Sequence, residues 1–322
     1  MGKISTKLTH VCRGWRDLFI SRSSLWTGLN FTNIDKTLTF IRRSQSSPLK
    51  FYIGEYDVLD DALALGIPHI FRIKSLTIES WRLRLISILR HFHCHTPLLE
   101  KLDIKLSNPF DTRDLDATIP NWDISSLREL HLNRVATNLP WKNLVNLRIL
   151  TLISHRRSYE TTQILDFLES TPLLHTVFLR YPFQNPSDAP PERTVRLRHI
   201  KALTIVAEPR NANPPHLALI RHLHIPIGAS LISEFDSPHG ESPFLEYLPE
   251  RCPNLSNLSD ITTINLLFGS CSEPSSMRLS GPSGSLYAST SWEDRIYSWV
   301  NHKFLYVGDK AILESLDRKS VV

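Results

Sequence analysis

An apolar triplet with the pattern L-x-x-L-x-L, in which Ile or Val can replace Leu, recurs seven times along the chain. Successive central residues are 20 to 28 positions apart. In a strand, alternate side chains point to opposite faces, so the fourth and sixth positions of each triplet point to one side. The copies are Ile73-Leu76-Ile78, Leu99-Leu102-Ile104, Leu127-Leu130-Leu132, Leu147-Leu150-Leu152, Leu174-Val177-Leu179, Ile200-Leu203-Ile205 and Ile220-Leu223-Ile225.

This period leaves room for one strand and one return connection in each copy, which is typical of a leucine-rich repeat. A single copy cannot bury its apolar face alone, whereas stacked copies share a continuous core. We therefore expect an α/β fold, a leucine-rich-repeat solenoid of horseshoe form. Such a fold indicates a curved interaction scaffold rather than an enzyme with a pocket.

Composition agrees with a folded chain, since 41% of the 322 residues are hydrophobic and 21% are charged. The formal net charge of +5 is scattered along the sequence. Its tightest clusters, Arg42-Arg43, Arg82 with Arg84, and Arg156-Arg157, are too short to follow a phosphate backbone. We therefore expect no nucleic-acid partner.

Targeting signals and covalent cross-links are not predicted. The four cysteines (Cys12, Cys94, Cys252, Cys271) show neither a C-x-x-C pair nor the spacing of a disulfide framework. No signal peptide and no apolar run of about 18 residues is present. We expect a soluble chain with reduced thiols in the cytoplasm, the nucleus or both, without a membrane partner.

The elements between the triplets are expected to vary with the length of the step. Helices are predicted over 7–20, over Lys36–Arg43, and as return connections over Trp81–Phe92 and Tyr159–Leu168. Leu49, Phe51 and Ile53 alternate like an earlier strand, and Ile264 and Leu266 like a later one. The two 20-residue steps are too short for a full helix and predict an extended or 3₁₀ connection.

These patterns divide the chain into four regions. The division predicts a helical segment over 1–31, repeats over 32–268, a Ser/Gly/Pro-rich loop over 269–291, and a C-terminal cap or tail over 292–322.

No sequence pattern indicates catalysis. The motifs H-E-x-x-H, G-x-S-x-G, G-x-G-x-x-G and the P-loop are all missing. His91 and His95 have the i, i+4 spacing that can hold zinc, but no second pair follows at finger spacing. Solvated or capping histidines are the favoured interpretation. We therefore predict no catalytic residue, no metal, no cofactor and no enzymatic activity.

The segment Leu8-Thr-His-Val-Cys-Arg-Gly-Trp-Arg-Asp-Leu18, followed by Ser23-Ser-Leu-Trp26 and Leu29, resembles the second half of an F-box. The same V-C-R-x-W-R-x-L helix and L-W-x-x-L turn are found in fungal F-box proteins with leucine-rich repeats. The resemblance implies a substrate receptor of a Skp–cullin–F-box ubiquitin ligase, which binds an unknown protein target. It also implies that the Skp-type adaptor is contacted by Val11, Trp15, Leu18, Leu25 and Trp26.

The first half of an F-box, an L-P-x-E-type helix, has no counterpart in Met1–Lys7. Either the gene begins upstream or adaptor binding has been lost. We expect this chain to bind the adaptor weakly or not at all, and an upstream-extended form to bind it well. The alternative function is a free-standing leucine-rich-repeat scaffold, in which Trp15 and Leu18 pack onto the first repeat as a cap.

The third, fifth and seventh positions of each triplet are predicted to form the concave face. In sequence this face is charged at first, apolar in the middle, and ends at His222 and His224. Its apolar part, with an arginine beside it, has the composition of an interface hot spot. The residues predicted to bind the target are Ile149, Thr151, Ile153, Phe178, Arg180, Thr204 and Val206. The alternative interpretation is that the β-branched residues among them occur only because such residues favour strands, and not because they bind a target.

Overall fold

The structure is a computed structural model of the full chain. It describes residues 12–54, 59–92, 96–107, 115–117, 124–137, 141–153, 159–180, 193–207, 219–235, 263–267, 275–281 and 284–290. The chain divides into two compact units, Met1–Arg156 and Arg157–Val322. Both are α/β units built on a largely parallel sheet.

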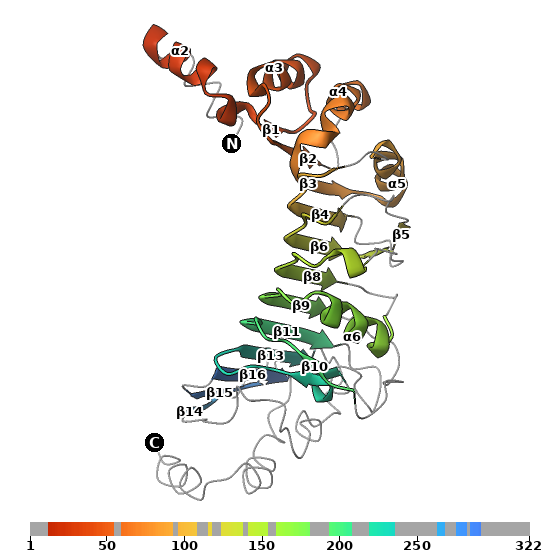
Figure 1. Cartoon of the computed structure of the whole chain (residues 1–322), viewed down its shortest axis with the longest axis vertical. Coiled ribbons are helices and arrows are strands. Elements are labelled where there is room, and N and C mark those ends of the chain that lie inside the picture. Colours follow the sequence, from red (N-terminus) through yellow and green to blue (C-terminus); the bar gives the residue numbers. More distant parts are fainter. Residues whose placement is uncertain are drawn as a thin grey trace, which may run out of the picture. The chain divides into compact units, whose positions relative to one another are not determined.

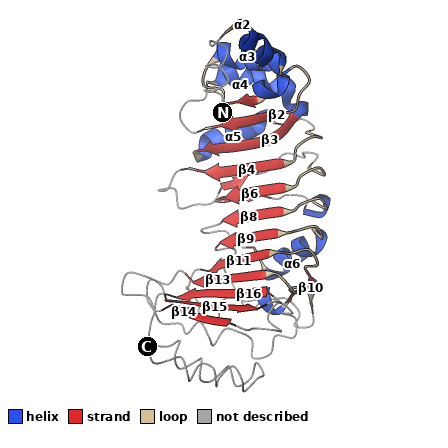
Figure 2. Cartoon of the chain, turned by 90° about the vertical axis from the view of Figure 1, so that its left-hand side faces the viewer, coloured by secondary structure: helices blue, strands red, loops and turns tan. Residues whose placement is uncertain are grey.

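The first unit arranges its strands in the order β1-β2-β3-β4-β6-β8, and every neighbouring pair is parallel. Its helices α4 and α5 lie on one face of the sheet, and α3 lies next to α4 at the β1 end (Figure 1). The opposite face is turned toward the viewer in Figure 2, and we call it the open face. The helices are α2 (Arg13–Ser21), η1 (Ser23–Trp26), α3 (Ile34–Ser44), α4 (Asp60–Gly66), η2 (Ile67–Arg72), α5 (Arg82–His91) and η3 (Trp141–Asn143). The sheet strands are β1 (Gly28–Leu29), β2 (Leu49–Ile53), β3 (Ile73–Ser80), β4 (Lys101–Leu106), β6 (Glu129–Asn133) and β8 (Ile149–Ile153), and the short strands β5 (Leu115–Ala117) and β7 (Val135–Thr137) form a separate pair.

The predicted register is confirmed in this unit. The central triplet residues Leu76, Leu102, Leu130 and Leu150 are cross-strand partners of one another along β3, β4, β6 and β8. All four are fully buried. Since each such side chain stabilises the fold by roughly 1.5–3 kcal/mol, the leucine row is the main core of the unit.

Aromatic side chains fill the N-terminal end of the same core. Trp26 meets Phe40 edge-to-face with ring centroids 5.1 Å apart, and Phe31 meets Phe51 in the same way at 4.9 Å. Phe31 has a backbone φ of 56°, which a bulky residue adopts only where packing enforces it. The close approach of its ring requires glycine at position 66, because a Cβ there would lie 2.7 Å from Phe31 Cε1.

The second unit arranges its strands in the order β9-β11-β13-β16-β15-β14. The pairs from β9 to β16 are parallel, whereas β16, β15 and β14 pair antiparallel. Val177 of β9 and Leu231 of β13 are both cross-strand partners of Leu203 of β11. The elements are α6 (Thr161–Ser170), β9 (Thr176–Arg180), β10 (Val195–Arg196), β11 (Ala202–Ala207), β12 (Leu223–His224), β13 (Ser230–Phe235), β14 (Thr263–Leu267), β15 (Ser275–Gly281) and β16 (Gly284–Thr290).

The seventh triplet does not lie in the main sheet, so this part of the predicted register is wrong. Its residue Leu223 belongs to β12, which pairs with β10 in a separate two-stranded sheet. The strand that follows β11 in the main sheet is β13, centred eight residues later on Leu231. The triplet misleads because any buried strand shows the same alternation, whichever sheet it joins. Leu223 and Ile225 are indeed fully buried.

The region 269–291, predicted as a loop, contains a β-hairpin. Strands β15 and β16 pair antiparallel from Ser275 with Thr290 to Gly281 with Gly284. Many serines hide the period-two pattern of Met277 and Leu279 that a strand requires. The strand predicted at Ile264 exists as β14, at the antiparallel end of the sheet.

The remaining predicted elements are largely confirmed. The return helices α5 and α6 are found where they were predicted, with ends shifted by one or two residues. Helix α3 includes the predicted Lys36–Arg43 and is longer at both ends. The short step before Leu150 uses strand β7 and the 3₁₀ turn η3. The helix predicted over 7–20 is described as α2 from Arg13, while residues 7–11 and the tail 292–322 lie outside the described residues.

Candidate interaction surface

Helix α2 leaves its apolar stripe open to solvent. None of its residues is buried, and Trp15 and Leu18 expose 50% and 48% of their surface. Trp15 stacks on Phe19 at a centroid distance of 5.8 Å, within the same helix. Leu25, in η1, is also exposed. Among the predicted adaptor contacts, these three side chains are therefore accessible, while Val11 lies outside the described residues.

Trp26, the fifth predicted adaptor contact, belongs to the core instead. Its side chain is fully buried, and its indole Nε1 donates a hydrogen bond of 2.8 Å to the backbone oxygen of Phe19. The guanidinium of Arg43 lies 4.3 Å from the ring centroid, in cation–π geometry. Trp26 therefore fastens the end of α2 to the first unit and offers no surface to a partner.

The open face of the first unit presents the predicted positions side by side. Ile149, Thr151 and Ile153 of β8 are partly exposed and neighbour Glu129, His131 and Asn133 of β6.

Charged side chains on neighbouring strands of this face form ion pairs with one another. Lys105 Nζ lies 2.6 Å from Glu79 Oε1, and Lys101 Nζ lies 2.9 Å from Glu129 Oε2. The hydrogen bond to Glu79 raises the pKa of Lys105 above its ordinary value. Side chains that already form ion pairs have few hydrogen-bonding groups left for a partner. The charged part of the face is therefore a weaker candidate binding surface than the apolar part.

His131 lies between the charged and apolar parts of the face. Its Nδ1 shares a hydrogen bond of 3.0 Å with Thr151 Oγ1, and its Nε2 is 3.9 Å from Glu129 Oε2. Burial lowers the pKa of His131, and the positive charge of Lys101 lowers it further, against the opposing effect of Asp103 and Glu129. The neutral imidazole is therefore favoured at neutral pH.

In the second unit, three of the four predicted target contacts are partly exposed. Phe178 and Thr204 are cross-strand partners on β9 and β11, and Arg180 pairs in register with Val206. Val206 itself is buried, with 5% of its surface exposed, so it does not fit the predicted binding surface.

The predicted end of the concave face at His222 and His224 is wrong. His222 is buried, and its Nδ1 lies 2.7 Å from the backbone oxygen of Arg193. His224 belongs to β12, and His222 directly precedes this strand. The backbone bonds from Val195 N to His222 O and from Leu197 N to His224 O hold the separate sheet of β10 and β12 together.

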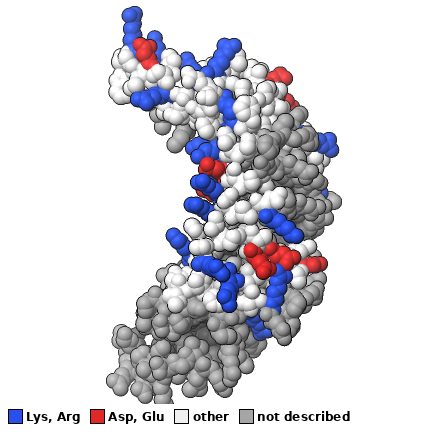
Figure 3. Space-filling model, viewed as in Figure 1, with Lys and Arg blue, Asp and Glu red and all other residues white. Residues whose placement is uncertain are grey.

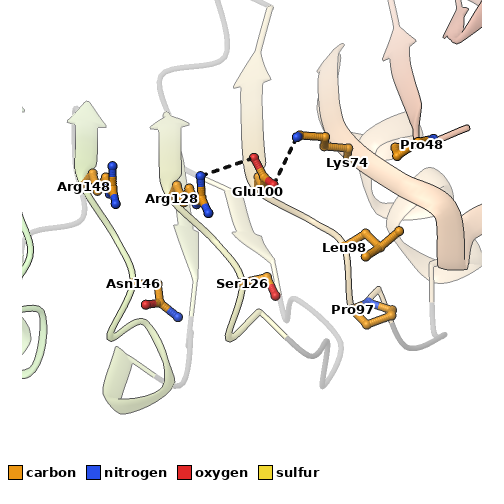
Figure 4. Close-up of a pocket in the computed structure, with 9 residues that line it drawn as sticks. All are labelled: Pro48, Lys74, Pro97, Leu98, Glu100, Ser126, Arg128, Asn146 and Arg148. Carbon is orange, nitrogen blue, oxygen red and sulfur yellow. Dashed lines mark ion pairs between the residues drawn. The ribbon is translucent and has the colours of Figure 1, made fainter. Parts of the chain in front are cut away.

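One surface feature escaped the sequence analysis. The second positions of four successive triplets, Lys74, Glu100, Arg128 and Arg148, form a row across the strand starts of β3, β4, β6 and β8 (Figure 4). We call these four residues the charge row. The signal was present in the triplets, but only the third, fifth and seventh positions were considered as surface.

The described residues hold no group of three or more His, Cys, Asp or Glu side chains that could bind a metal ion. His95 and the residues just before it lie outside that part of the chain. None of the described helices is both long and apolar enough to span a membrane. The chain matches no known protein family, and neither a curated protein nor a solved structure shows detectable similarity to it.

Proposed function

We propose that this chain is a leucine-rich-repeat solenoid that acts as a protein-interaction module, the substrate receptor of a Skp–cullin–F-box ubiquitin ligase. The solenoid assignment is supported by the parallel strands whose leucines Leu76, Leu102, Leu130 and Leu150 stack in register. It is also supported by the placement of the helices on one sheet face, which leaves the other free for a target (Figures 1 and 2).

The observation that carries the receptor proposal is the open apolar stripe of α2. Trp15 and Leu18 each expose about half of their surface, although residues of these types are normally covered. An exposed tryptophan beside a leucine is typical of an interface anchor. In the proposal the Skp-type adaptor covers this stripe together with Leu25, and the ligase performs the chemistry in the cytoplasm or the nucleus.

Calorimetric titration with a Skp-type adaptor tests this function. Because the stripe supplies only half of an F-box surface, we expect weak binding, strengthened by fusing an L-P-x-E-type helix ahead of the chain. Replacing Trp15 and Leu18 by alanine should abolish the binding of both forms, since each buried anchor typically contributes over 1 kcal/mol. The matched control replaces Arg13 and Asp17, on the polar side of α2, by alanine. Equal binding by the two double variants would refute the adaptor role.

A free-standing scaffold is the second candidate, and the burial of Trp26 favours it. The L-W pair, which implies adaptor contact by resemblance, serves the core here through Trp26. In this case the sheet binds a partner without ubiquitin. The cap role expected for Trp15 and Leu18 is not part of this alternative, because both side chains are about half exposed. No adaptor binding by either form, together with retained target binding, would establish this alternative.

A further inference from the structure

The charge row contains two neighbouring cations without enough counter-charge. The carboxylate of Glu100 forms an ion pair with Lys74, with 3.1 Å between Oε1 and Nζ. Its other oxygen, Oε2, lies 4.0 Å from Nη1 of Arg128. Arg148 makes no ion pair with any described residue. The backbone nitrogen of Arg148 donates to the Arg128 oxygen at 2.8 Å, so the two arginines are direct neighbours.

This arrangement is unfavourable in the free protein. Neighbouring strands lie about 4.8 Å apart, which brings two like charges side by side at the sheet edge. Like charges in such cross-strand positions destabilise a sheet. On the other side of Arg128 the carboxylate of Glu100 relieves the same repulsion. A second carboxylate between Arg128 and Arg148 would complete the alternation of charge, and arginine binds carboxylates in a two-pronged geometry.

A groove of about 280 Å³ opens at the charge row (Figure 4). One wall is the charge row, and the other is formed by apolar and small polar residues of the turns that precede the strands. This volume is below the usual range for small-molecule sites and suits one or two side chains of a peptide. The other wall consists of Pro97, Leu98, Ser126 and Asn146, and Pro48 lies beyond Lys74 at the end of the charge row.

The surroundings of the groove extend its positive charge. A neighbouring hollow of about 400 Å³ shares all four residues of the charge row and adds Lys50, Lys101 and Glu129 to its lining. Cations therefore outnumber carboxylates by five to two around it. Figure 3 shows basic side chains, with an acidic group among them, along the side of the first unit that carries the open face.

The opposite wall is suited to an apolar side chain. Leu98 exposes 46% of its surface beside Pro97, in the turn before β4. Asn146 donates its Nδ2 to the Ser125 backbone oxygen at 2.8 Å, which fixes the amide at the groove and leaves its oxygen as an acceptor for a peptide N–H.

We propose that this groove binds an extended acidic segment of a partner protein. An Asp or Glu carboxylate of the segment lies between Arg128 and Arg148, and an apolar side chain of the segment packs on Pro97 and Leu98. Leu98 lies just before β4 and Arg148 just before β8, and β6 is the strand between them. Two inter-strand spacings of about 4.8 Å make about 10 Å, so about three extended residues of the segment separate its two anchors. This inference rests on the proposed role as an interaction module, but it does not involve the adaptor.

Fluorescence anisotropy with the full chain tests the proposal directly. The probe is a fluorescein-labelled twelve-residue peptide of Ser and Gly that carries one Leu and, three residues later, an Asp-Asp pair. We expect saturable binding that weakens about tenfold for Arg148→Gln and strengthens for Glu100→Gln, which removes the competing carboxylate. The matched control Arg90→Gln removes the same charge from the exposed side of α5 and should leave binding unchanged.

Two further peptides separate the possible ligands. In one the Asp-Asp pair is replaced by Asn-Asn, and in the other by a phosphoserine. The Asn peptide should lose binding. No saturable binding of the Asp peptide, equal losses in Arg148→Gln and Arg90→Gln, or binding of the phosphopeptide alone would each overturn the proposal. Because no adaptor is present, these results are independent of the ubiquitin-ligase role.

Discussion

Replacing Trp26 by alanine should destabilise the first unit far more than the same change at Trp15. Trp26 is fully buried, and truncation of a buried tryptophan costs about 3–5 kcal/mol, against a typical total of about 5–15. Trp15 is half exposed, so its loss should cost below about 1 kcal/mol. The milder Trp26→Phe keeps most of the packing but loses the hydrogen bond to Phe19, with an expected cost of about 1–2 kcal/mol.

Urea denaturation followed by circular dichroism measures these differences. Hydrogen exchange of the α2 amides supplies a local readout, because the Trp26–Phe19 hydrogen bond ties the end of α2 to the unit. Trp26→Phe should accelerate exchange across Arg13–Ser21, whereas Trp15→Ala should change the exchange only slightly. If Trp26→Ala and Trp15→Ala shift the unfolding midpoint equally, Trp26 is not a core residue and does not fasten η1 to the rest of the unit.

Two further predictions concern the first unit. Gly66→Ala should lower the free energy of unfolding by about 1–2 kcal/mol despite the better helix propensity of alanine, because the added Cβ would meet the buried ring of Phe31. Gly28→Ala is the control in the same thermal melts, since a Cβ at that position has no neighbouring atom within 4 Å. Equal melting temperatures of the two variants would contradict the clash. His131 has a lowered pKa in the folded state, so its contribution to stability is present above its ordinary pKa of about 6.5 and is lost as the pH falls. His131→Gln should therefore flatten the decline in melting temperature between pH 7.5 and 5.5, and an unchanged slope would contradict this assignment.

The repeat period predicted the core of the first unit well, because burial acts on the same positions that the triplet specifies. Leu76, Leu102 and Leu130 are fully buried cross-strand partners, as expected from the spacing. The period failed at Leu223, since alternation reports a buried strand and contains no information on which sheet that strand joins. The hairpin of β15 and β16 was missed because its many serines obscure the period-two alternation of a strand and are also typical of a loop.

Surface assignments were less predictable than the core. Trp26 and Val206 are buried although both were expected to contact partners, because their depth depends on neighbours distant in sequence such as Phe40. The charge row was overlooked because its members are 20 to 28 residues apart and become neighbours only when the strands stack in register. Arg148 shows no unusual feature in the sequence alone.

The antiparallel strands at the end of the second unit limit how this sheet can grow. A tandem duplication of a strand with its return connection can be inserted between two parallel strands, where both neighbours run in the same direction. The direction reverses at β15, so a repeat added beyond β16 would meet β15 with reversed polarity. Gain or loss of repeats during evolution is therefore expected between β9 and β13 of the second unit, and related chains should differ in length there while they keep the hairpin of β15 and β16.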